Sequence, residues 1–330
     1  MTDDRSKLES EIGTALCQND GTRMSIANIR TGKRPAPDRV LVIGVEGVGK
    51  SSWSAGAPSP IYIAAEDGIR ELDVASFPEP RSFAEILEAI ERLRADAHDY
   101  KTVVIDTADW VEPLIVAHVC ADRGWMRNGK PDIEQPGYGK GWVATVEEWR
   151  RLVTAIEALR AERSMGAIVL AHAAIKSFAN PIGPDYARYE TKLAKGAAAL
   201  LKEWADTILF ATYEEYTTKE NKGARPKGLS TGRRVAKTER SAAWDAKNRY
   251  GLPPELPFGL GAWPDYERAR EAGRSESGTA LLEEADRLID QLTNRAKADQ
   301  ARAYIDANTN FPERLASAVD RLRTLLENQP

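Results

Sequence analysis

A glycine-rich segment of this chain has the residue types and spacing of a loop that binds a polyphosphate. It reads Gly44-x-x-x-x-Gly49-Lys50-Ser51 and follows the apolar run 40–43. Glycines let the backbone turn several N–H groups inward around phosphate oxygens, Lys50 can reach the β- and γ-phosphates, and the Ser51 hydroxyl can bind Mg²⁺. The apolar run predicts a buried parallel strand, so the loop has the context that a Walker A motif requires; a turn without a ligand is the alternative. The predicted nucleotide-binding residues of the loop are Gly44, Val45, Glu46, Gly47, Val48, Gly49, Lys50, Ser51 and Ser52.

Polar residues also follow three other predicted strands. They are Glu66 after the run 61–65, Asp106 at the end of 102–106, and His172 at the end of 167–172. Ligands of an open α/β sheet bind beyond the carboxyl ends of its strands, so we expect these residues to meet the glycine-rich loop. We interpret Asp106 as the Walker B aspartate, which would hold Mg²⁺ together with Ser51. A helix cap is the alternative interpretation of Asp106.

The general base for an attacking water has to come from a strand other than the one that carries Asp106. The residue after this aspartate is Thr107, where a glutamate would be the simplest base. Glu66 is therefore the candidate base, and a solvated carboxylate in a turn is the alternative. His172 could donate a hydrogen bond to the γ-phosphate and report its presence to the following loop, although a structural histidine is equally compatible with this position.

These residues require a sheet that brings strand ends together. Apolar strands alternate with amphipathic helices, which predicts an α/β fold with a doubly wound, mainly parallel sheet and an antiparallel hairpin at one edge. The predicted helices are 82–95, 110–120, 146–159 and 190–204, and the predicted hairpin strands are 208–213 and 233–236. We predict an N-terminal arm over 1–37, a nucleotide-binding core over 38–262 and a helical C-terminal tail over 263–330.

Composition limits the class of protein. The chain has 330 residues, 42% apolar and 29% charged, with a net charge of −4, the balance of a soluble globular protein. Cys17 and Cys120 are too few and too far apart for a disulfide framework or a cysteine metal cluster. The N-terminus lacks the apolar core of a signal peptide, and no segment approaches membrane-spanning length. We therefore expect a cytoplasmic protein without a membrane partner.

Two features favour contact with a nucleic acid. Residues 217–249 contain ten basic and three acidic residues, an excess of seven positive charges that can bind a polyanion. The predicted loop 123–142 interleaves aromatic and basic residues, a pattern that suits stacking on unpaired bases. A solvated hairpin and an aromatic anchor for the next helix, through Trp142, are the respective alternatives. A second irregular loop is predicted over 173–188.

With these residues in place, the chain resembles the RecA-like P-loop ATPases over about residues 38–260. The resemblance implies that Glu66 is the catalytic glutamate, that His172 senses the γ-phosphate and that the two loops contact DNA. The segment Lys247-Asn248-Arg249-Tyr250-Gly251 resembles the motif that RadA-type members present to a neighbouring subunit. It implies that Lys247 and Arg249 act in trans on the neighbour's nucleotide. An ordinary basic turn is the alternative.

Within that superfamily the chain resembles phage-type ATP-binding proteins, including the fourth Sak family of single-strand annealing recombinases. The resemblance rests on Ala-Glu-Asp-Gly at 65–68, Gly-Tyr-Gly-Lys-Gly at 137–141 and Lys-Asn-Arg-Tyr-Gly-Leu-Pro at 247–253. It implies ATP and Mg²⁺ as ligands, a homo-oligomeric ring or filament, single-stranded DNA and a single-strand-binding protein as partners, and a phage-infected or prophage-carrying bacterial host.

Two functions of different classes follow from these motifs. The first is an ATP-hydrolysing protein of DNA recombination or single-strand annealing. The second is a nucleotide-dependent DNA or protein binding module with negligible turnover. Loaders and remodellers that carry a glutamate directly after the Walker B aspartate are disfavoured, because Thr107 stands at that position.

Overall fold

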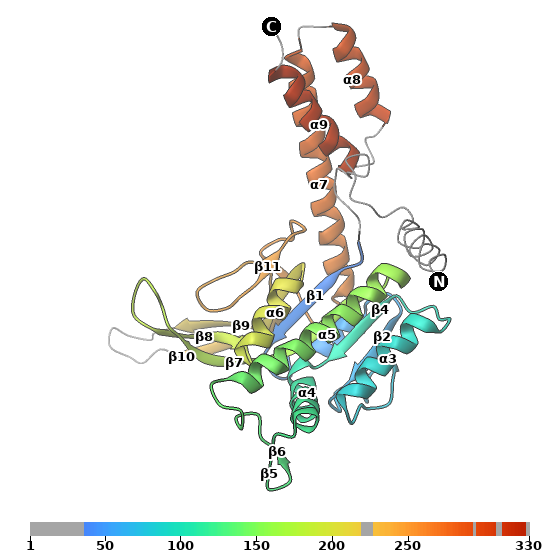
Figure 1. Cartoon of the computed structure of the whole chain (residues 1–330). Coiled ribbons are helices and arrows are strands. Elements are labelled where there is room, and N and C mark those ends of the chain that lie inside the picture. Colours follow the sequence, from blue (N-terminus) through green and yellow to red (C-terminus); the bar gives the residue numbers. More distant parts are fainter. Residues whose placement is uncertain (1–35, 219–226, 293–294, 308–311, 328–330) are drawn as a thin grey trace, which may run out of the picture. The chain divides into compact units, whose positions relative to one another are not determined.

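The computed structural model describes residues 36–218, 227–292, 295–307 and 312–327. The described residues fall into two compact units, of which the first lies within Pro35–Ser277 and the second includes Gly278–Pro330 (Figure 1). The boundary falls inside helix α7, which runs from Trp263 to Asp290. The predicted N-terminal arm lies outside the described residues except for Ala36 and Pro37.

The first unit is built on a mixed sheet in which ten of the described strands take part. Their order is β12-β10-β9-β1-β7-β4-β2-β3, with β8 paired to β7 and β11 paired to β9. The neighbours from β9 through β1, β7, β4 and β2 to β3 are parallel, whereas β10 runs antiparallel to β9 and to β12. The strands are β1 (Arg39–Gly44), β2 (Pro60–Ala64), β3 (Ala75–Ser76), β4 (Thr102–Asp106), β7 (Gly166–Phe178), β8 (Tyr186–Thr191), β9 (Thr207–Thr218), β10 (Lys227–Lys237), β11 (Lys247–Asn248) and β12 (Glu255–Pro257).

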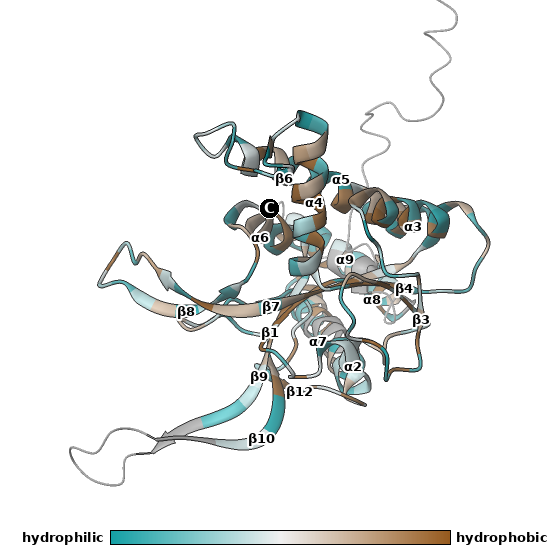
Figure 2. Cartoon of the chain, turned by 90° about the horizontal axis from the view of Figure 1, so that it is seen from below, coloured by the Kyte–Doolittle hydropathy of each residue, from teal (hydrophilic) through white to brown (hydrophobic). Residues whose placement is uncertain are grey.

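Helices cover both faces of this sheet, which explains the apolar runs 40–43, 103–105 and 167–171 in its central strands. In β1, Leu41 and Ile43 belong to one buried cluster and Val40 and Val42 to another, as expected when successive side chains point to opposite faces. The first cluster is completed by α3 (Phe83–Ala95), α4 (Ala108–Arg123), α5 (Lys140–Arg163) and α6 (Lys195–Trp204). The second is completed by α2 (Lys50–Ser54) and the first turns of α7 (Figure 2). The predicted doubly wound, mainly parallel sheet with its edge hairpin is confirmed.

One predicted loop is instead regular structure. Strand β7 does not end at His172 but continues to Phe178, and its second half pairs with β8 from Ala173 opposite Thr191 to Phe178 opposite Tyr186. The prediction of an irregular loop over 173–188 was therefore wrong: this segment is a β-hairpin that projects from the sheet (Figure 1). A shorter two-stranded hairpin, β5 (Met126–Arg127) with β6 (Lys130–Pro131), lies inside the predicted loop 123–142.

The second unit is helical, as predicted for the C-terminal tail. It contains the last turns of α7 together with α8 (Arg295–Ala307) and α9 (Pro312–Glu327). The three helices bury a small apolar cluster of their own, which includes Ala285, Ile289, Ile305, Val319 and Leu322. Within the described ranges, no helix combines the length and the apolar composition needed to cross a membrane.

Candidate nucleotide-binding site

Strand register aligns the predicted site residues along one edge of the sheet. Gly44 of β1 lies opposite His172 of β7, and Ala64 of β2 lies opposite Asp106 of β4. Since β7 also pairs with β4, the four strands follow one another in the order β1, β7, β4, β2. The structure therefore brings the glycine-rich loop, His172, Asp106 and Glu66 to the same edge, where the ligands of such sheets bind.

Lys50 is held inside the glycine-rich loop. Its side chain is buried, with the residue only 6% exposed, and Nζ lies 3.2 Å from the carbonyl oxygen of Val45 and 3.4 Å from that of Gly44. Gly47 and Gly49 have φ of +71° and +92°, a left-handed conformation that favours glycine. Burial lowers the pKa of Lys50, although the nearby carboxylates of Asp106 and Glu66 oppose the shift. Within the described residues, the Lys50 ammonium donates its hydrogen bonds to neutral carbonyls, and a phosphate would give it a charged acceptor in direct contact.

Ser51 and Asp106 form the pair that a magnesium ion would use. The Ser51 hydroxyl donates a hydrogen bond of 2.6 Å to Asp106 Oδ2, while Asp106 Oδ1 is buried without a hydrogen-bond partner among the described residues. Burial raises the pKa of Asp106. Mg²⁺ is bound in proteins by one or two oxygen ligands in combination with substrate phosphates and water, so this donor set fits the ion.

Glu66 lies in the bend after β2, within the same electrostatic environment. The pKa of this half-buried carboxyl is raised by burial and further by the Asp106 and Asp109 carboxylates, whereas His172 and Lys50 act in the opposite direction. A Cβ placed on Gly68 would be 3.6 Å from Glu66 Oε1 and 3.9 Å from Ser51 Oγ, so Gly68 separates the glutamate from the Ser51 hydroxyl by no more than the space of one small side chain. A carboxylate with a raised pKa is a stronger proton acceptor near neutral pH.

His172 is held by a carboxylate that the sequence did not point to. Its backbone N–H donates to Asp109 Oδ1 at 2.8 Å, and its ring Nδ1 lies 2.8 Å from Asp109 Oδ2. Burial favours the protonated form of Asp109, but the hydrogen bonds from His172 lower its pKa overall. Asp109 stands in the first turn of α4, three residues after Asp106, which is the only sequence signal for it. The pairing fixes the imidazole ring and leaves Nε2 as the nitrogen that can contact a ligand.

An ion pair connects the glycine-rich loop to the β7–β8 hairpin. Glu46 of the loop pairs with Lys192 at 2.6 Å, and this hydrogen bond lowers the pKa of the Glu46 carboxyl. Lys192 directly follows β8, and its backbone N–H donates to the carbonyl of His172 at 2.9 Å. The loop is thus linked to the base of the hairpin as well as to the candidate sensor.

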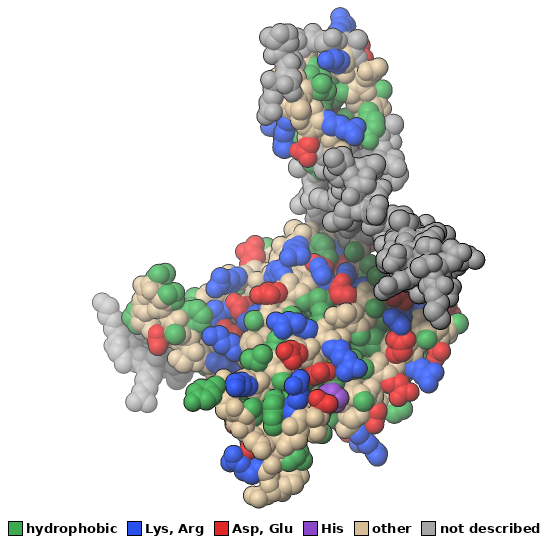
Figure 3. Space-filling view, viewed as in Figure 1, with side chains coloured by type: hydrophobic (Ala, Val, Ile, Leu, Met, Phe, Trp, Pro, Cys, Tyr) green, Lys and Arg blue, Asp and Glu red, His purple; other side chains and the backbone are tan. Residues whose placement is uncertain are grey.

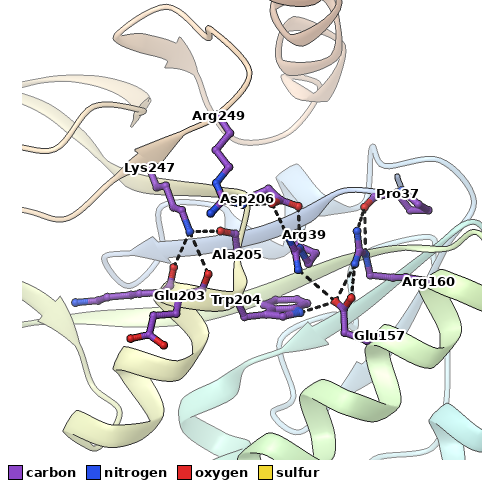
Figure 4. A network of polar contacts seen from close by, with 11 residues as sticks. Pro37, Arg39, Glu157, Arg160, Glu203, Trp204, Ala205, Asp206, Lys247 and Arg249 are labelled. Atoms are coloured by element: carbon purple, nitrogen blue, oxygen red, sulfur yellow. Dashed lines mark hydrogen bonds and ion pairs between the residues drawn. The ribbon is translucent and has the colours of Figure 1, made fainter. Parts of the chain in front are cut away.

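Lys247 and Arg249 lie elsewhere in the same chain. Lys247 Nζ donates to the carbonyls of Lys202, Glu203 and Ala205 at 3.1, 3.1 and 2.5 Å, so it caps the carboxyl end of α6 (Figure 4). Arg249 Nη1 donates to Asp206 Oδ1 at 2.8 Å. Strand β11, which contains Lys247 and directly precedes Arg249, pairs with the first two residues of β9, whereas Gly44 pairs with Ala211 of β9. The structure does not bring these cations to the glycine-rich loop of their own chain.

Asp206 is the centre of a part-buried ionic network that joins β1, β9 and β11 (Figure 4). Arg39 binds it with two nitrogens, at 2.8 Å to Oδ2 and 2.6 Å to Oδ1, while Arg249 binds the same Oδ1. Burial alone would raise the pKa of Asp206, but the hydrogen bonds and charge of Arg39 and the charge of Arg249 lower it overall.

Replacement of Asp206 by asparagine is expected to lower the free energy of unfolding by about 2 kcal/mol, because it removes the nearer of the two carboxylates that balance the part-buried Arg39 guanidinium and leaves only Glu157, at 3.8 Å. Asp67→Asn, which breaks an exposed pair with Arg70, is the matched control and should change the free energy of unfolding by less than about 0.5 kcal/mol.

Since the folded-state pKa of Asp206 is depressed, the stabilisation that its carboxylate provides is present above the ordinary aspartate pKa of 3.8 and is lost as pH falls through the folded-state value. Urea denaturation at neutral pH and near pH 3 measures both effects; an equal loss for the two variants would contradict the expectation.

The basic excess of residues 217–249 is largely neutralised where the structure describes it. Arg233 and Lys237 pair with Glu255, Arg240 with Asp245 and Arg249 with Asp206, and two of those acids lie outside the counted stretch. Lys219, Lys222 and Arg225 lie outside the described residues. Figure 3 shows basic and acidic side chains interspersed over the face of the first unit in view. The described part of the stretch therefore offers a weaker polyanion surface than its composition predicts.

The two predicted DNA loops differ in what they expose. Tyr138 is fully exposed between two glycines, whereas Trp125 packs against the core and Trp142 Nε1 donates to Glu134 at 2.5 Å. In the β7–β8 hairpin both cations have internal partners, since Lys176 Nζ donates to a backbone carbonyl and buried Arg188 pairs with Asp245. Tyr138 is thus the clearest candidate for stacking on a base.

Comparison with known proteins identifies the family. The crystal structure of the RadB recombinase is similar over 69% of this chain and 90% of that chain, with 13% sequence identity and a TM-score of 0.38, which is too low to carry a conclusion about function. No curated protein matches the chain. A family model described as an AAA domain matches residues 36–250, a range that includes the glycine-rich loop and the strand ends described above. The chain therefore belongs to this AAA domain family.

Proposed function

We propose that the chain is a RecA-like ATPase that binds ATP with Mg²⁺ at the strand ends and acts on single-stranded DNA in recombination or annealing. The observation that carries the proposal is the Ser51–Asp106 pair with its unpartnered buried Oδ1, placed beside the buried ammonium of Lys50. Structural aspartates seldom leave a buried oxygen unsatisfied, whereas a metal site requires one.

Each residue of the site has a distinct task in this proposal. The loop N–H groups and Lys50 bind the β- and γ-phosphates, and Ser51 and Asp106 hold Mg²⁺, which neutralises phosphate charge when bound. Glu66 accepts the proton of the attacking water. His172, oriented by Asp109, donates a hydrogen bond to the γ-phosphate.

The proposal extends to a second copy of the chain and to DNA. Lys247 and Arg249 would complete a neighbouring subunit's site in a ring or filament, since they lie away from the loop of their own chain. Tyr138 would stack on an unpaired base. The phage-type annealing role, a single-strand-binding protein as partner and the cytoplasm of a bacterial host are the finer parts of the proposal, and they are supported by the sequence resemblance.

The test is ATP turnover as a function of protein concentration, with and without single-stranded DNA. Trans-acting cations require the turnover per chain to rise as subunits assemble, and DNA is expected to raise it further. Phosphate release that is absent at every concentration, with DNA present, would overturn the enzymatic part. Turnover per chain that does not change with concentration would confine the site to one subunit.

A binding module with negligible turnover is the second candidate, and the Glu46–Lys192 pair favours it. This pair connects the loop that would hold the nucleotide to the β7–β8 hairpin, so a bound nucleotide could order the hairpin without being hydrolysed. This candidate predicts DNA or protein binding that requires ATP and that survives Glu66→Gln unchanged.

A further inference from the structure

Arg234 of β10 lies directly against the glycine-rich loop. Its Nη1 is 3.0 Å from the position that a Cβ on Gly49 would occupy and 3.5 Å from the corresponding position on Gly259. The backbone carbonyl of Arg234 accepts a hydrogen bond of 3.1 Å from the N–H of Phe258, which fixes the strand against the turn after β12. The guanidinium therefore occupies space that these two glycines leave free.

Tyr213 holds the same side of the loop. Its hydroxyl donates a hydrogen bond of 2.9 Å to the carbonyl of Gly47, and it pairs with Arg234 in the β9–β10 register. The Arg234 guanidinium carbon lies 5.9 Å from the centre of the tyrosine ring. Since a cation over an aromatic face is stabilised, the ring supports Arg234 beside the loop without neutralising its charge.

The charge of Arg234 is not compensated by an ion pair within the described part of the chain, and the residue is exposed. The preceding residue differs in this respect, because Arg233 pairs with Glu255 and Glu214. Of the two arginines, only Arg234 has its guanidinium against the loop glycine Gly49, whereas the Arg233 guanidinium lies against these two carboxylates. A guanidinium without an ion-pair partner has several N–H donors in a fixed planar arrangement, which can bind two phosphate oxygens at once.

We infer that Arg234 is a further nucleotide-binding residue, which contacts a phosphate of the bound nucleotide from within the same chain. The inference rests on the proposed function. Strand order places β10 on one side of β1, and β7, β4 and β2 on the other side, where His172, Asp106 and Glu66 lie. Arg234 therefore approaches the loop from the flank opposite the candidate base Glu66. A contact on that flank is with the phosphates that remain after hydrolysis, so we expect Arg234 to contribute to the affinity for ADP.

The experiment measures ADP affinity by calorimetry for the wild type, Arg234→Ala, Arg234→Lys and the matched control Arg233→Ala. A charge-assisted hydrogen bond to phosphate predicts that Arg234→Ala raises the Kd about 10-fold and that Arg234→Lys recovers part of the loss. Arg233→Ala is expected to stay within about twofold, because its partner is Glu255 and not the ligand. Thermal unfolding of each variant without nucleotide verifies that the comparison concerns folded protein.

Failure of the inference about Arg234 can be distinguished from failure of the proposed function. If the wild type binds ADP and Lys50→Ala abolishes binding while Arg234→Ala stays within twofold of the wild type, the inference about Arg234 is overturned and the proposed function stands. If the wild type binds neither ADP nor ATP, the proposed function itself fails, and the inference fails with it. Should Arg234→Ala unfold, an ADP affinity of Arg234→Lys equal to or above that of the wild type would likewise overturn the inference.

Discussion

Glu66→Gln is expected to reduce ATP turnover by about 10²- to 10⁴-fold while it leaves the affinity for ATP within severalfold of the wild type. The substitution preserves the shape of the side chain but removes its capacity to accept a proton from water. Ser51, Asp106 and Lys50, which contact the phosphates and the metal in the proposal, are unchanged. Steady-state phosphate release gives the turnover, and calorimetry gives the affinity.

Asp67→Asn is the matched control for this experiment, because Asp67 is the next residue and pairs with exposed Arg70. It should retain the wild-type turnover. Since burial raises the pKa of Glu66 above its ordinary value of 4.5, the base is lost by protonation as pH falls through that raised value. The acid limb of the turnover profile should therefore lie above pH 4.5. Full turnover by Glu66→Gln would remove Glu66 from the mechanism and favour the binding module.

The second large effect is the recovery of activity by mixing two inactive variants. Lys50→Ala lacks a working phosphate loop, and Arg249→Ala lacks a cation for its neighbour's site. If Arg249 acts in trans, random co-assembly gives about a quarter of the interfaces an intact loop facing an intact arginine, and turnover should recover to about that fraction. Phosphate release is measured for each variant alone and for the equimolar mixture.

Arg249 also pairs with Asp206 inside its own chain, so loss of activity in Arg249→Ala alone does not separate the two roles. The mixture does separate them, because Lys50→Ala cannot restore a network inside another chain. Arg240→Ala, which breaks a pair with Asp245, controls for a general loss of positive charge and should retain activity. An inactive mixture of two folded variants that co-assemble would contradict the trans role.

The sequence predicted the strand ends of the site well, for a physical reason. Parallel strands covered on both faces are near-continuous apolar runs, so a charged residue after such a run indicates the point where the strand ends. Asp106 and Glu66 were proposed as site residues in this way, and parallel pairing brings the ends of their strands to the same edge. His172 fits the same rule only in part, because its strand continues as a hairpin.

The parts that could not be predicted depend on partners that are distant along the chain. In the sequence, Asp109 is an ordinary acidic residue in the first turn of a helix. Its role depends on His172, which lies 63 positions away and contacts it only in the folded chain. The β7–β8 hairpin contains the sequence Asn-Pro-Ile-Gly-Pro at 180–184, which is typical of a loop, and the antiparallel pairing of Ala173–Phe178 with Tyr186–Thr191 makes the segments on either side regular. A charge count over 217–249 likewise cannot include Glu255, which lies beyond the window and neutralises two of its cations.

Nucleotide binding at the glycine-rich loop is tested by calorimetric titration of ATP with Mg²⁺ into the wild type, Lys50→Ala and the surface control Lys101→Ala. Loss of the buried ammonium from the phosphate loop is expected to weaken binding by about 100-fold or more, and the control should bind like the wild type. Burial of the charged Lys50 side chain costs free energy in the folded protein, as its lowered pKa indicates. Removal of this charge relieves that cost, so Lys50→Ala should remain folded. Equal ATP affinity of the wild type and Lys50→Ala, or no binding by the wild type, would contradict the account.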